Sequence, residues 1–362
     1  MSIFGKLFNK KKKVEQKRGF HKLKVKELKR LTPDAVQVIF DIPEDLKTKY
    51  KYVPGQYLNV SVELSDNEII RSYSICSSIN EDLSIAVKEV EGGLVSNFIN
   101  DDLQEGDSIL VSEPMGNFKL LDAGKKYVAI AAGSGITPIA SIVKTINLSQ
   151  QGQIDLFYCN KSEKDTMFKD DLDDLSNDKV KIHYSYTRDE VDGAGHGRLT
   201  ENKISELIKQ DLDLLKSDGF YLCGPEQMIY DALNALKTFG VPENKINFEL
   251  FTTPEIIKTE TVETSESFEG TSQVVVVLDD EETEFELPTD GDTILDEVLS
   301  QGIDAPYSCR GGVCSTCRAK ILEGSAKMDS NMGLTDSEVE DGYILTCQSH
   351  PTSSKIKVTY DD

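Results

Sequence analysis

The sequence predicts a multidomain protein in which an antiparallel β-barrel is followed by an α/β domain and then by a small α+β domain. Short runs of alternating polarity, rich in Val, Ile and Tyr, fill residues 19–122, as in small antiparallel barrels. Residues 123–252 alternate between strand and helix patterns, which is typical of a doubly wound parallel sheet. Three cysteines spaced C-x4-C-x2-C mark residues 268–362 as a further domain.

Turn-forming residues separate the predicted elements of the barrel. A short helix is predicted at 94–100, and the predicted strands are residues 21–31, 35–41, 56–64, 69–77, 83–89 and 108–111.

In the α/β domain, a continuous apolar run at 127–132 predicts a buried parallel strand. Further strands are predicted at 154–159, 180–186 and 220–223, and helices at 138–147, 167–175, 204–208 and 226–238. Residues 253–267, rich in Thr, Glu and Ser, predict a linker. Beyond the linker we expect a hairpin of 272–278 and 283–287, a helix at 293–301 and a last strand at 356–360.

Length and composition indicate a globular protein. The 362 residues suffice for two or three domains, and a hydrophobic content of 38% suffices for their cores. The sequence has no apolar run of about 18 residues and no apolar segment behind its basic start, so we expect neither a membrane span nor a signal peptide. Seven cysteines suit a reducing cytoplasm, where we expect the protein to be.

The net charge of −23 is unevenly distributed. Residues 1–30 carry twelve Lys and Arg against two Glu, whereas residues 268–362 carry twenty Asp and Glu against six Lys and Arg. The acidic end argues against a nucleic-acid partner and favours attraction to a basic protein surface, although acidity also promotes solubility alone. The basic tail, residues 1–18, has few apolar residues, which favours a solvated tail over a membrane-surface anchor.

The cysteine spacing predicts a metal centre. Cys309, Cys314 and Cys317, with Cys347 after a long gap, have the plant-type spacing for a 2Fe–2S cluster, which needs four thiolates. The glycines at 311 and 312 allow the loop to wrap and to turn backbone N–H groups toward the sulfurs. Zinc is the alternative, but its sites usually pair two C-x2-4-C knuckles. A disulfide is disfavoured because nothing indicates secretion.

Two motifs in the barrel predict a flavin dinucleotide site. Arg71-Ser-Tyr73-Ser74 lies on the fourth predicted strand, and Gly92-Gly93-Leu-Val-Ser96 opens the short helix. A flavin dinucleotide needs an aromatic platform, hydrogen bonds at its ring edge, and a cation and helix N–H groups at its pyrophosphate. Tyr73 and Ser74 suit the ring, and Arg71, Gly93 and Ser96 suit the pyrophosphate.

A second nucleotide site is predicted at the carboxyl ends of the parallel strands. Gly133-Ser-Gly135-Ile-Thr137-Pro138 follows the buried strand and opens a helix, so that a pyrophosphate can approach the helix N-terminus. Pro138 stands at the last glycine position of G-x-G-x-x-G, a departure from the usual dinucleotide pattern. Cys223-Gly224-Pro225 ends the fourth strand, and we expect the two turns to face each other.

These motifs, in this order and spacing, resemble the ferredoxin–NADP reductase family, with a plant-type 2Fe–2S ferredoxin fused behind it. The resemblance covers residues 20–362 and implies a β-grasp fold for the ferredoxin domain. It implies that FAD is held by Arg71, Tyr73, Ser74, Gly92, Gly93 and Ser96. It also implies that the nicotinamide cofactor is held by Gly133, Gly135, Thr137, Pro138, Cys223, Gly224 and Pro225, and the cluster by Cys309, Cys314, Cys317 and Cys347.

The same resemblance implies which residues lie at the reacting rings. Tyr73 and Ser74 would contact the flavin, and Cys223 would lie near the nicotinamide. Glu249 and Phe251 match an acid and an aromatic beside the flavin, although an ordinary core position is the alternative for Phe251. We count these five as the candidate catalytic residues.

The choice between NADPH and NADH depends on recognition of the adenosine 2′-phosphate. Thr187-Arg188-Asp189 follows the third strand of the α/β domain and resembles the Ser-Arg-Glu element of NADP-preferring relatives. A hydroxyl and a guanidinium suit a phosphate dianion, and Lys161 is a further candidate cation. We therefore expect NADPH, with NADH as the alternative because Thr replaces Ser.

The resemblance implies a reductase component that passes electrons from NADPH through FAD and the 2Fe–2S cluster to an oxygenase. The segments YCNKSEKDTMF and YSCRGGVCSTC are similar to those of reductase subunits that serve phenylacetyl-CoA 1,2-epoxidases, which implies a diiron oxygenase partner in phenylacetate degradation. A reductase for another oxygenase, hydroxylase or desaturase, with NADH as a possible donor, is one alternative. A non-enzymatic electron carrier or redox sensor is another, which the two nucleotide motifs disfavour.

Overall fold

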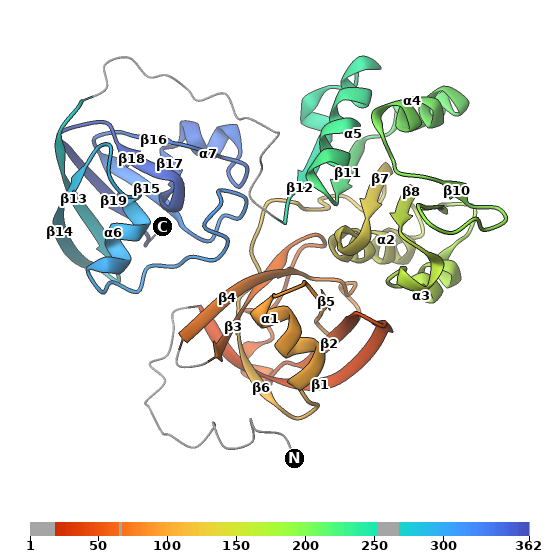
Figure 1. Cartoon of the computed structure of the whole chain (residues 1–362), viewed down its shortest axis with the longest axis horizontal. Coiled ribbons are helices and arrows are strands. Elements are labelled where there is room, and N and C mark those ends of the chain that lie inside the picture. Colours follow the sequence, from red (N-terminus) through yellow and green to blue (C-terminus); the bar gives the residue numbers. More distant parts are fainter. Residues whose placement is uncertain (1–18, 65–66, 252–267, 362) are drawn as a thin grey trace.

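The computed structural model describes residues 19–64, 67–251 and 268–361, which form a barrel, an α/β domain and a C-terminal domain (Figure 1). The multidomain fold class expected from the sequence is confirmed. The predicted basic tail and linker, residues 1–18 and 253–267, lie outside the described residues. Within the described chain, no helix is long and apolar enough to cross a membrane.

The barrel is a six-stranded antiparallel sheet in the order β4-β3-β6-β1-β2-β5. A bridge between Ile75 and Ile85 joins its two end strands, so the sheet closes on itself. Leu23, Val60 and Ile85 are among the side chains buried inside it. Its strands are β1 (Phe20–Thr32), β2 (Ala35–Asp41), β3 (Tyr57–Leu64), β4 (Asn67–Ser74), β5 (Ser84–Lys88) and β6 (Ser108–Ser112), and helix α1 (Leu94–Asn97) continues into a π-helical turn (Phe98–Asp102).

The α/β domain is a parallel sheet in the order β10-β9-β8-β7-β11-β12. The strand order reverses at β7, and in such folds ligands bind at that point, outside the carboxyl ends of the strands. The strands are β7 (Lys126–Ala132), β8 (Gln153–Asn160), β9 (Val180–Tyr186), β10 (Gly195–His196), β11 (Gly219–Cys223) and β12 (Ile246–Glu249). The helices are α2 (Ile136–Ser149), α3 (Lys169–Leu175), α4 (Glu201–Gln210) and α5 (Glu226–Thr238).

Helices cover both faces of this sheet, and one of them also joins the barrel. Helix α2 is buried almost throughout, because its core cluster includes Ala35, Cys76 and Ala86 of the barrel. Helices α4 and α5 pack on the other face, around Ile204, Ile229 and Cys159. Cys76 and Cys159 are therefore packing cysteines. Ser141 Oγ donates a hydrogen bond to the backbone oxygen of Ser77 at 2.6 Å, which also links the two domains.

The C-terminal domain is a mixed sheet in the order β14-β13-β19-β15-β17, in which only β13 and β19 pair in parallel. The predicted hairpin is confirmed, with a two-residue turn at Asp279 and Asp280, both at positive φ. The strands are β13 (Thr271–Leu278), β14 (Glu281–Pro288), β15 (Arg318–Glu323), β17 (Tyr343–Leu345) and β19 (Lys355–Thr359). Helices α6 (Ile294–Ser300) and α7 (Asp336–Glu340) and a small sheet of β16 (Ala326–Met328) and β18 (Ser349–Pro351) complete the domain.

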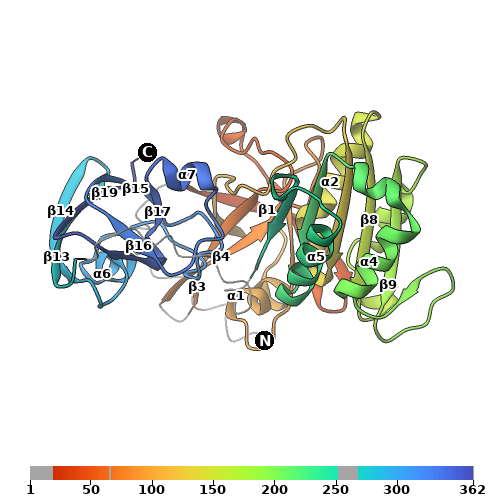
Figure 2. The same cartoon turned by 90° about the horizontal axis from the view of Figure 1, so that it is seen from above.

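The C-terminal domain lies against β3 and β4 of the barrel (Figure 2). The cysteine loop makes this contact: Ser308 and Thr316 form hydrogen bonds with Ser72 and Asn59 of the barrel. Val313 and Met332 of the C-terminal domain also pack against the core of the α/β domain. The cysteine loop therefore touches both other domains.

Candidate functional site

The two glycine turns of the α/β domain face each other, as expected. A Cβ atom added at Gly135 would lie 2.2 Å from the backbone oxygen of Cys223, so only glycine fits this close approach. A Cβ atom at Gly224 would lie 2.6 Å from Cε of Met228. Thr137 is buried and donates to the backbone oxygen of Ser134 at 3.0 Å. Pro138 lies in the first turn of α2, where its missing N–H costs no helical hydrogen bond.

Three predicted catalytic residues meet where the barrel contacts the α/β domain. Cys223 and Glu249 are partners in the register of β11 and β12, and Ser74 of the barrel donates from Oγ to Oε2 of Glu249 at 3.1 Å. Burial raises the pKa of Glu249 to about 8, despite the opposing effect of the Ser74 hydrogen bond. Burial, together with the nearby Glu249, also raises the pKa of the Cys223 thiol. Both groups are therefore neutral at pH 7.

Tyr73 and Phe251 lie close in sequence to Ser74 and Glu249, respectively. The Tyr73 side chain is half-buried against the barrel core, and burial raises the pKa of its hydroxyl group. Phe251 has an exposed fraction of 44%, so its position is not that of an ordinary core residue. An exposed aromatic ring at this place fits the expected role beside a flavin, which stays a prediction.

The barrel residues expected to bind the flavin pyrophosphate differ in whether their side chains are free to contact an anion. Arg71 is exposed and donates to the backbone oxygen of Ile70 at 2.8 Å, and it has no acidic partner among the described residues. Gly92 has a φ of +73°, and Gly93 precedes α1 directly. Ser96 is buried, and its hydroxyl accepts a hydrogen bond from the backbone N–H of Val90 at 3.2 Å. Ser96 therefore holds the Gly92–Gly93 turn in this structure, while Arg71 is available to an anion.

Two exposed cations lie side by side at the carboxyl ends of β8 and β9. The backbone N–H of Arg188 donates to the backbone oxygen of Lys161 at 2.9 Å, and that of Thr187 donates to Asn160 at 3.0 Å. Neither Arg188 nor Lys161 forms an ion pair within the described part of the chain. This arrangement suits a phosphate group, as the Thr-Arg motif predicted.

The four cysteines of the C-terminal domain are arranged as two pairs. Cys314 is the largest influence on the pKa of Cys309, which it lowers, and Cys347 is the largest influence on the pKa of Cys317, which it raises. The described residues contain no group of three or more side chains that could hold a single metal ion. A single zinc needs four ligands around one point, whereas a two-iron cluster divides four thiolates between two irons. The four cysteines therefore fit a 2Fe–2S cluster.

The backbone of the loop also suits a cluster. The N–H groups of Gly311 and Cys314 both point to Sγ of Cys309, each at 3.4 Å. The hydrogen bond from Cys314 lowers the pKa of Cys309 against the effect of burial, and these N–H groups add to the decrease. Gly312 has a φ of +72°, and a Cβ atom there would lie 2.8 Å from the backbone oxygen of Ser330. The other residue of this loop with a positive φ is Arg310. Gly311, which the sequence suggested for such a conformation, does not have a positive φ.

Sequence reasoning missed a set of polar residues between the cysteine loop and the barrel. We call this set the Asn59 network; its members are Tyr57, Asn59, Ser72, Ser308 and Thr316. The alternation of β3 places Asn59 opposite the barrel core, where a polar residue suggests contact with solvent. Its exposed fraction is 0%, and Thr316 of the docked C-terminal domain is among the residues that contact its side chain.

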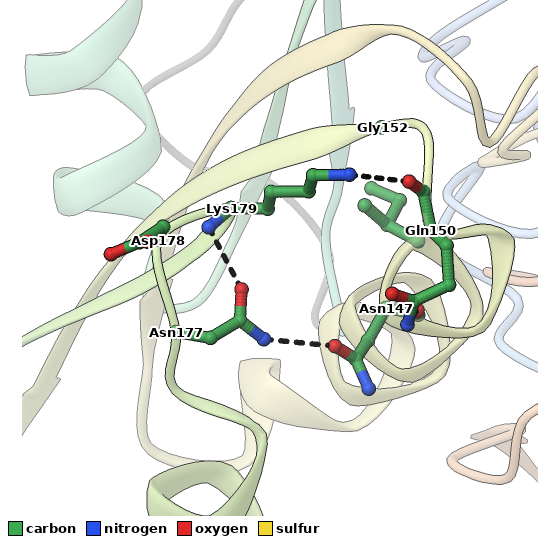
Figure 3. A pocket seen from close by; sticks show the side chains of 7 residues that line it. Asn147, Gln150, Gly152, Asn177, Asp178 and Lys179 are labelled. Carbon is green, nitrogen blue, oxygen red and sulfur yellow. Dashed lines mark hydrogen bonds between the residues drawn. The ribbon is translucent and has the colours of Figure 1, made fainter.

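Two hollows of the molecule lie away from this site. One pocket, at the end of α2, is lined by Asn147, Gln150, Asn177 and Lys179, which hydrogen bond with one another (Figure 3). The other is a cleft between the barrel and the α/β domain, crossed by an ion pair between Lys144 and Glu81 at 3.2 Å. Neither is lined by a predicted site residue.

Comparison with known families agrees with this geometry. The chain matches the oxidoreductase FAD-binding domain over residues 22–120, the oxidoreductase NAD-binding domain over residues 129–234 and the 2Fe-2S iron-sulfur cluster binding domain over residues 276–352. These matches define an NAD(P)H-dependent flavin and iron–sulfur oxidoreductase. The chain belongs to the family of ferredoxin–NADP reductase-type enzymes fused to a 2Fe–2S ferredoxin.

Relatives of known activity are components of oxygenase systems. The chain is 35% identical to a 1,2-phenylacetyl-CoA epoxidase subunit from Escherichia coli (strain K12), over 94% of this chain and 98% of that protein. It is 31% identical to the ferredoxin reductase component of 3-ketosteroid-9-alpha-monooxygenase from Mycobacterium tuberculosis (strain ATCC 25618 / H37Rv), over 94% and 96%. The structure of phthalate dioxygenase reductase shares the fold, with a TM-score of 0.57 at 24% identity over 94% and 98%. The chain is thus an electron-transfer reductase component of the kind that serves oxygenases.

Proposed function

We propose that this protein takes electrons from NADPH and delivers them to the diiron component of a phenylacetyl-CoA 1,2-epoxidase. The hydrogen bond between Ser74 and Glu249 supports the proposed transfer of electrons from NADPH to the flavin. It joins the predicted flavin motif to Glu249, the strand partner of Cys223 in the predicted nicotinamide site. The similarity to the Escherichia coli epoxidase protein supports the proposed delivery of electrons to an epoxidase component.

FAD, held by the flavin motif, and a 2Fe–2S cluster, held by the four cysteines, would supply the redox chemistry: two-electron hydride chemistry at the flavin and one-electron chemistry at the cluster. The residues of the chain position the reactants. The close approach of Gly135 to the backbone of Cys223 holds the two glycine turns together at the carboxyl ends of β7 and β11, where we expect the nicotinamide cofactor to bind. Glu249 holds a proton at pH 7 and so brings no negative charge to the site. Tyr73 and Phe251 offer aromatic surfaces.

For the nucleotide, Arg188 and Lys161 support NADPH over NADH, because both are exposed and neither forms an ion pair with another described residue. We expect Arg188→Ala to lower kcat/KM for NADPH about tenfold or more, because a hydrogen bond to a charged group contributes about 1.5–3 kcal/mol. The value for NADH should barely change. Steady-state kinetics with both nucleotides measure this ratio, and Lys209→Ala, an exposed cation on α4, is the control. An unchanged ratio in Arg188→Ala would contradict the assignment.

For the electron acceptor, reconstitution is the decisive experiment. The purified chain, NADPH and the diiron oxygenase component should together turn over phenylacetyl-CoA, and omission of the chain should stop turnover. The ketosteroid monooxygenase relative makes a steroid oxygenase component the comparison to run in parallel. If the chain supported turnover only with the steroid oxygenase component, that component would replace the proposed acceptor. The proposed path from NADPH through FAD to the cluster would still stand.

A further inference from the structure

Strand β3 is buried on both of its faces, although one of them is polar. Leu58, Val60 and Val62 point into the barrel core. On the outer face, Tyr57 has an exposed fraction of 4% and Asn59 of 0%. Strands of antiparallel sheets usually expose their polar face to water. Here the cysteine loop covers it, so the outer face of β3 is a built interface.

The side chain of Asn59 uses both ends of its amide group at this interface. Its Oδ1 accepts a hydrogen bond from Ser72 Oγ at 2.8 Å, within the barrel. Its Nδ2 donates to Thr316 Oγ1 at 3.1 Å, across the domain boundary, and also lies 3.3 Å from Met115 Sδ. The Tyr57 hydroxyl lies 3.2 Å from the same Thr316 Oγ1. Ser72 Oγ in turn lies 2.8 Å from Ser308 Oγ.

The network ends next to the predicted cofactor residues on each side. Ser72 lies between Arg71 and Tyr73 of the flavin motif. Ser308 precedes Cys309, and Thr316 lies between Cys314 and Cys317. The Ser72–Ser308 contact therefore joins two positions that each lie next to a predicted cofactor residue. Asn59, which accepts a hydrogen bond from Ser72, extends this link to Thr316.

Polar and apolar contacts contribute differently to such an interface: apolar packing favours docking, and buried hydrogen bonds fix the register. The packing of Val313 and Met332 against the α/β domain favours docking but tolerates small shifts. Buried hydrogen bonds are directional, and a shift of the loop would leave the amide of Asn59 unpaired away from water, which is costly. The Asn59 network thus fixes the register of the loop on the barrel.

We propose that Asn59 and Thr316 are positioning residues for electron transfer from the flavin to the cluster, because their buried hydrogen bond holds the cysteine loop in register against the flavin motif. This rests on the proposed electron path from FAD to the 2Fe–2S cluster. It assigns the two residues no contact with either cofactor.

The test uses the full-length chain loaded with flavin and cluster. Thr316→Val removes the hydroxyl at constant shape, Thr316→Ser keeps the hydroxyl, and Asn59→Leu removes the amide from the barrel side, away from the cluster ligands. Thr352→Val is the matched control, because that hydroxyl donates to Ser325 within the C-terminal domain. Stopped-flow spectroscopy after mixing with NADPH follows flavin reduction and then cluster reduction.

We expect cluster reduction to slow by about tenfold in Thr316→Val and Asn59→Leu, which corresponds to about 1.4 kcal/mol. The double variant should be no slower than the slower single variant, because both remove the same bond. Thr316→Ser and Thr352→Val should keep the rate of the unaltered protein. Flavin reduction and the electron paramagnetic resonance spectrum of the chemically reduced cluster should be the same in all.

A structural measurement accompanies the kinetics. Hydrogen exchange of peptides covering β3, on the barrel, should be faster in Thr316→Val than in Thr316→Ser, although the substitution is in the other domain. Equal rates and equal exchange in these two variants would overturn the positioning role. If the unaltered chain showed flavin reduction without any cluster reduction, the electron path itself would fall, and the positioning role with it.

Discussion

Ser74, Cys223 and Glu249 show how the site depends on single side chains from two domains. Ser74 ends a barrel strand, while the other two end neighbouring strands of the parallel sheet. The carboxyl group of Glu249 loses water at this domain contact and gains one hydrogen bond in return, which leaves its pKa near 8 instead of 4.5. The folded protein therefore keeps a proton that the unfolded chain releases.

This proton makes stability depend on pH. Between about pH 4.5 and about pH 8 the folded state binds more protons than the unfolded state, so stability falls as pH rises through this window. Glu249→Gln should remove this dependence. The melting temperature of the variant should therefore rise relative to that of the unaltered protein as the pH increases. The slope for one group is at most about 1.4 kcal/mol per pH unit. Thermal melts across this range measure it, with the exposed Glu243→Gln as control. Parallel melting curves for Glu249→Gln and the unaltered protein would contradict the raised pKa.

Gly135 is the second residue whose identity the site requires. Gly135→Ala places a methyl group against the backbone of Cys223, where no flexible side chain can move aside. We expect a loss of about 1–3 kcal/mol in stability and a higher KM for the nicotinamide nucleotide. Gly195→Ala is the matched control, because a Cβ atom there makes ordinary contacts at 3.4 Å or more. Melting temperature and KM check both variants, and equal behaviour would show that the turn relaxes.

At the scale of elements, the hairpin of β13 and β14 carries strain that a substitution can remove. Asp280 has a φ of +62°, a conformation that costs non-glycine residues roughly 1 kcal/mol, while its N–H donates to Asp361. Asp280→Gly keeps this N–H and should stabilise the C-terminal domain by about 0.5–1 kcal/mol. Thermal melts compare it with Asp290→Gly, at a nearby exposed residue without positive φ. A stabilisation shared by both variants would rule out relief of strain as the cause.

Most elements could be predicted from the sequence, because their patterns are local. The apolar run of β7 and the hairpin of β13 and β14 needed no knowledge of the rest of the chain. Short strands such as β10 and β16, with two and three residues, carry too little pattern to predict. The same limit explains the site: the cysteine ligands and glycine turns are local motifs. Asn59 matters only because a loop more than 240 residues further along the chain, at Thr316, covers it.

At the scale of the whole molecule, the acidic charge of residues 268–362 should steer the reductase toward its electron acceptor. We expect kcat/KM for an oxygenase component to fall when ionic strength rises from about 0.01 M to about 0.15 M, since the Debye length shrinks from about 30 Å to about 8 Å. The rate of electron transfer within the chain, measured as the rate of cluster reduction, should change little. A rate toward the oxygenase that is insensitive to salt would show that the acidity serves solubility alone.

The double burial of β3 bears on how such reductases can be recombined. A ferredoxin domain exchanged from another protein would meet a polar row that bonds to Ser308 and Thr316 in this chain, and an unmatched loop would leave the amide of Asn59 without its partner in that domain. Successful chimeras should therefore carry the outer residues of β3 together with the cysteine loop. The unit that evolution can exchange in this enzyme extends across a domain boundary.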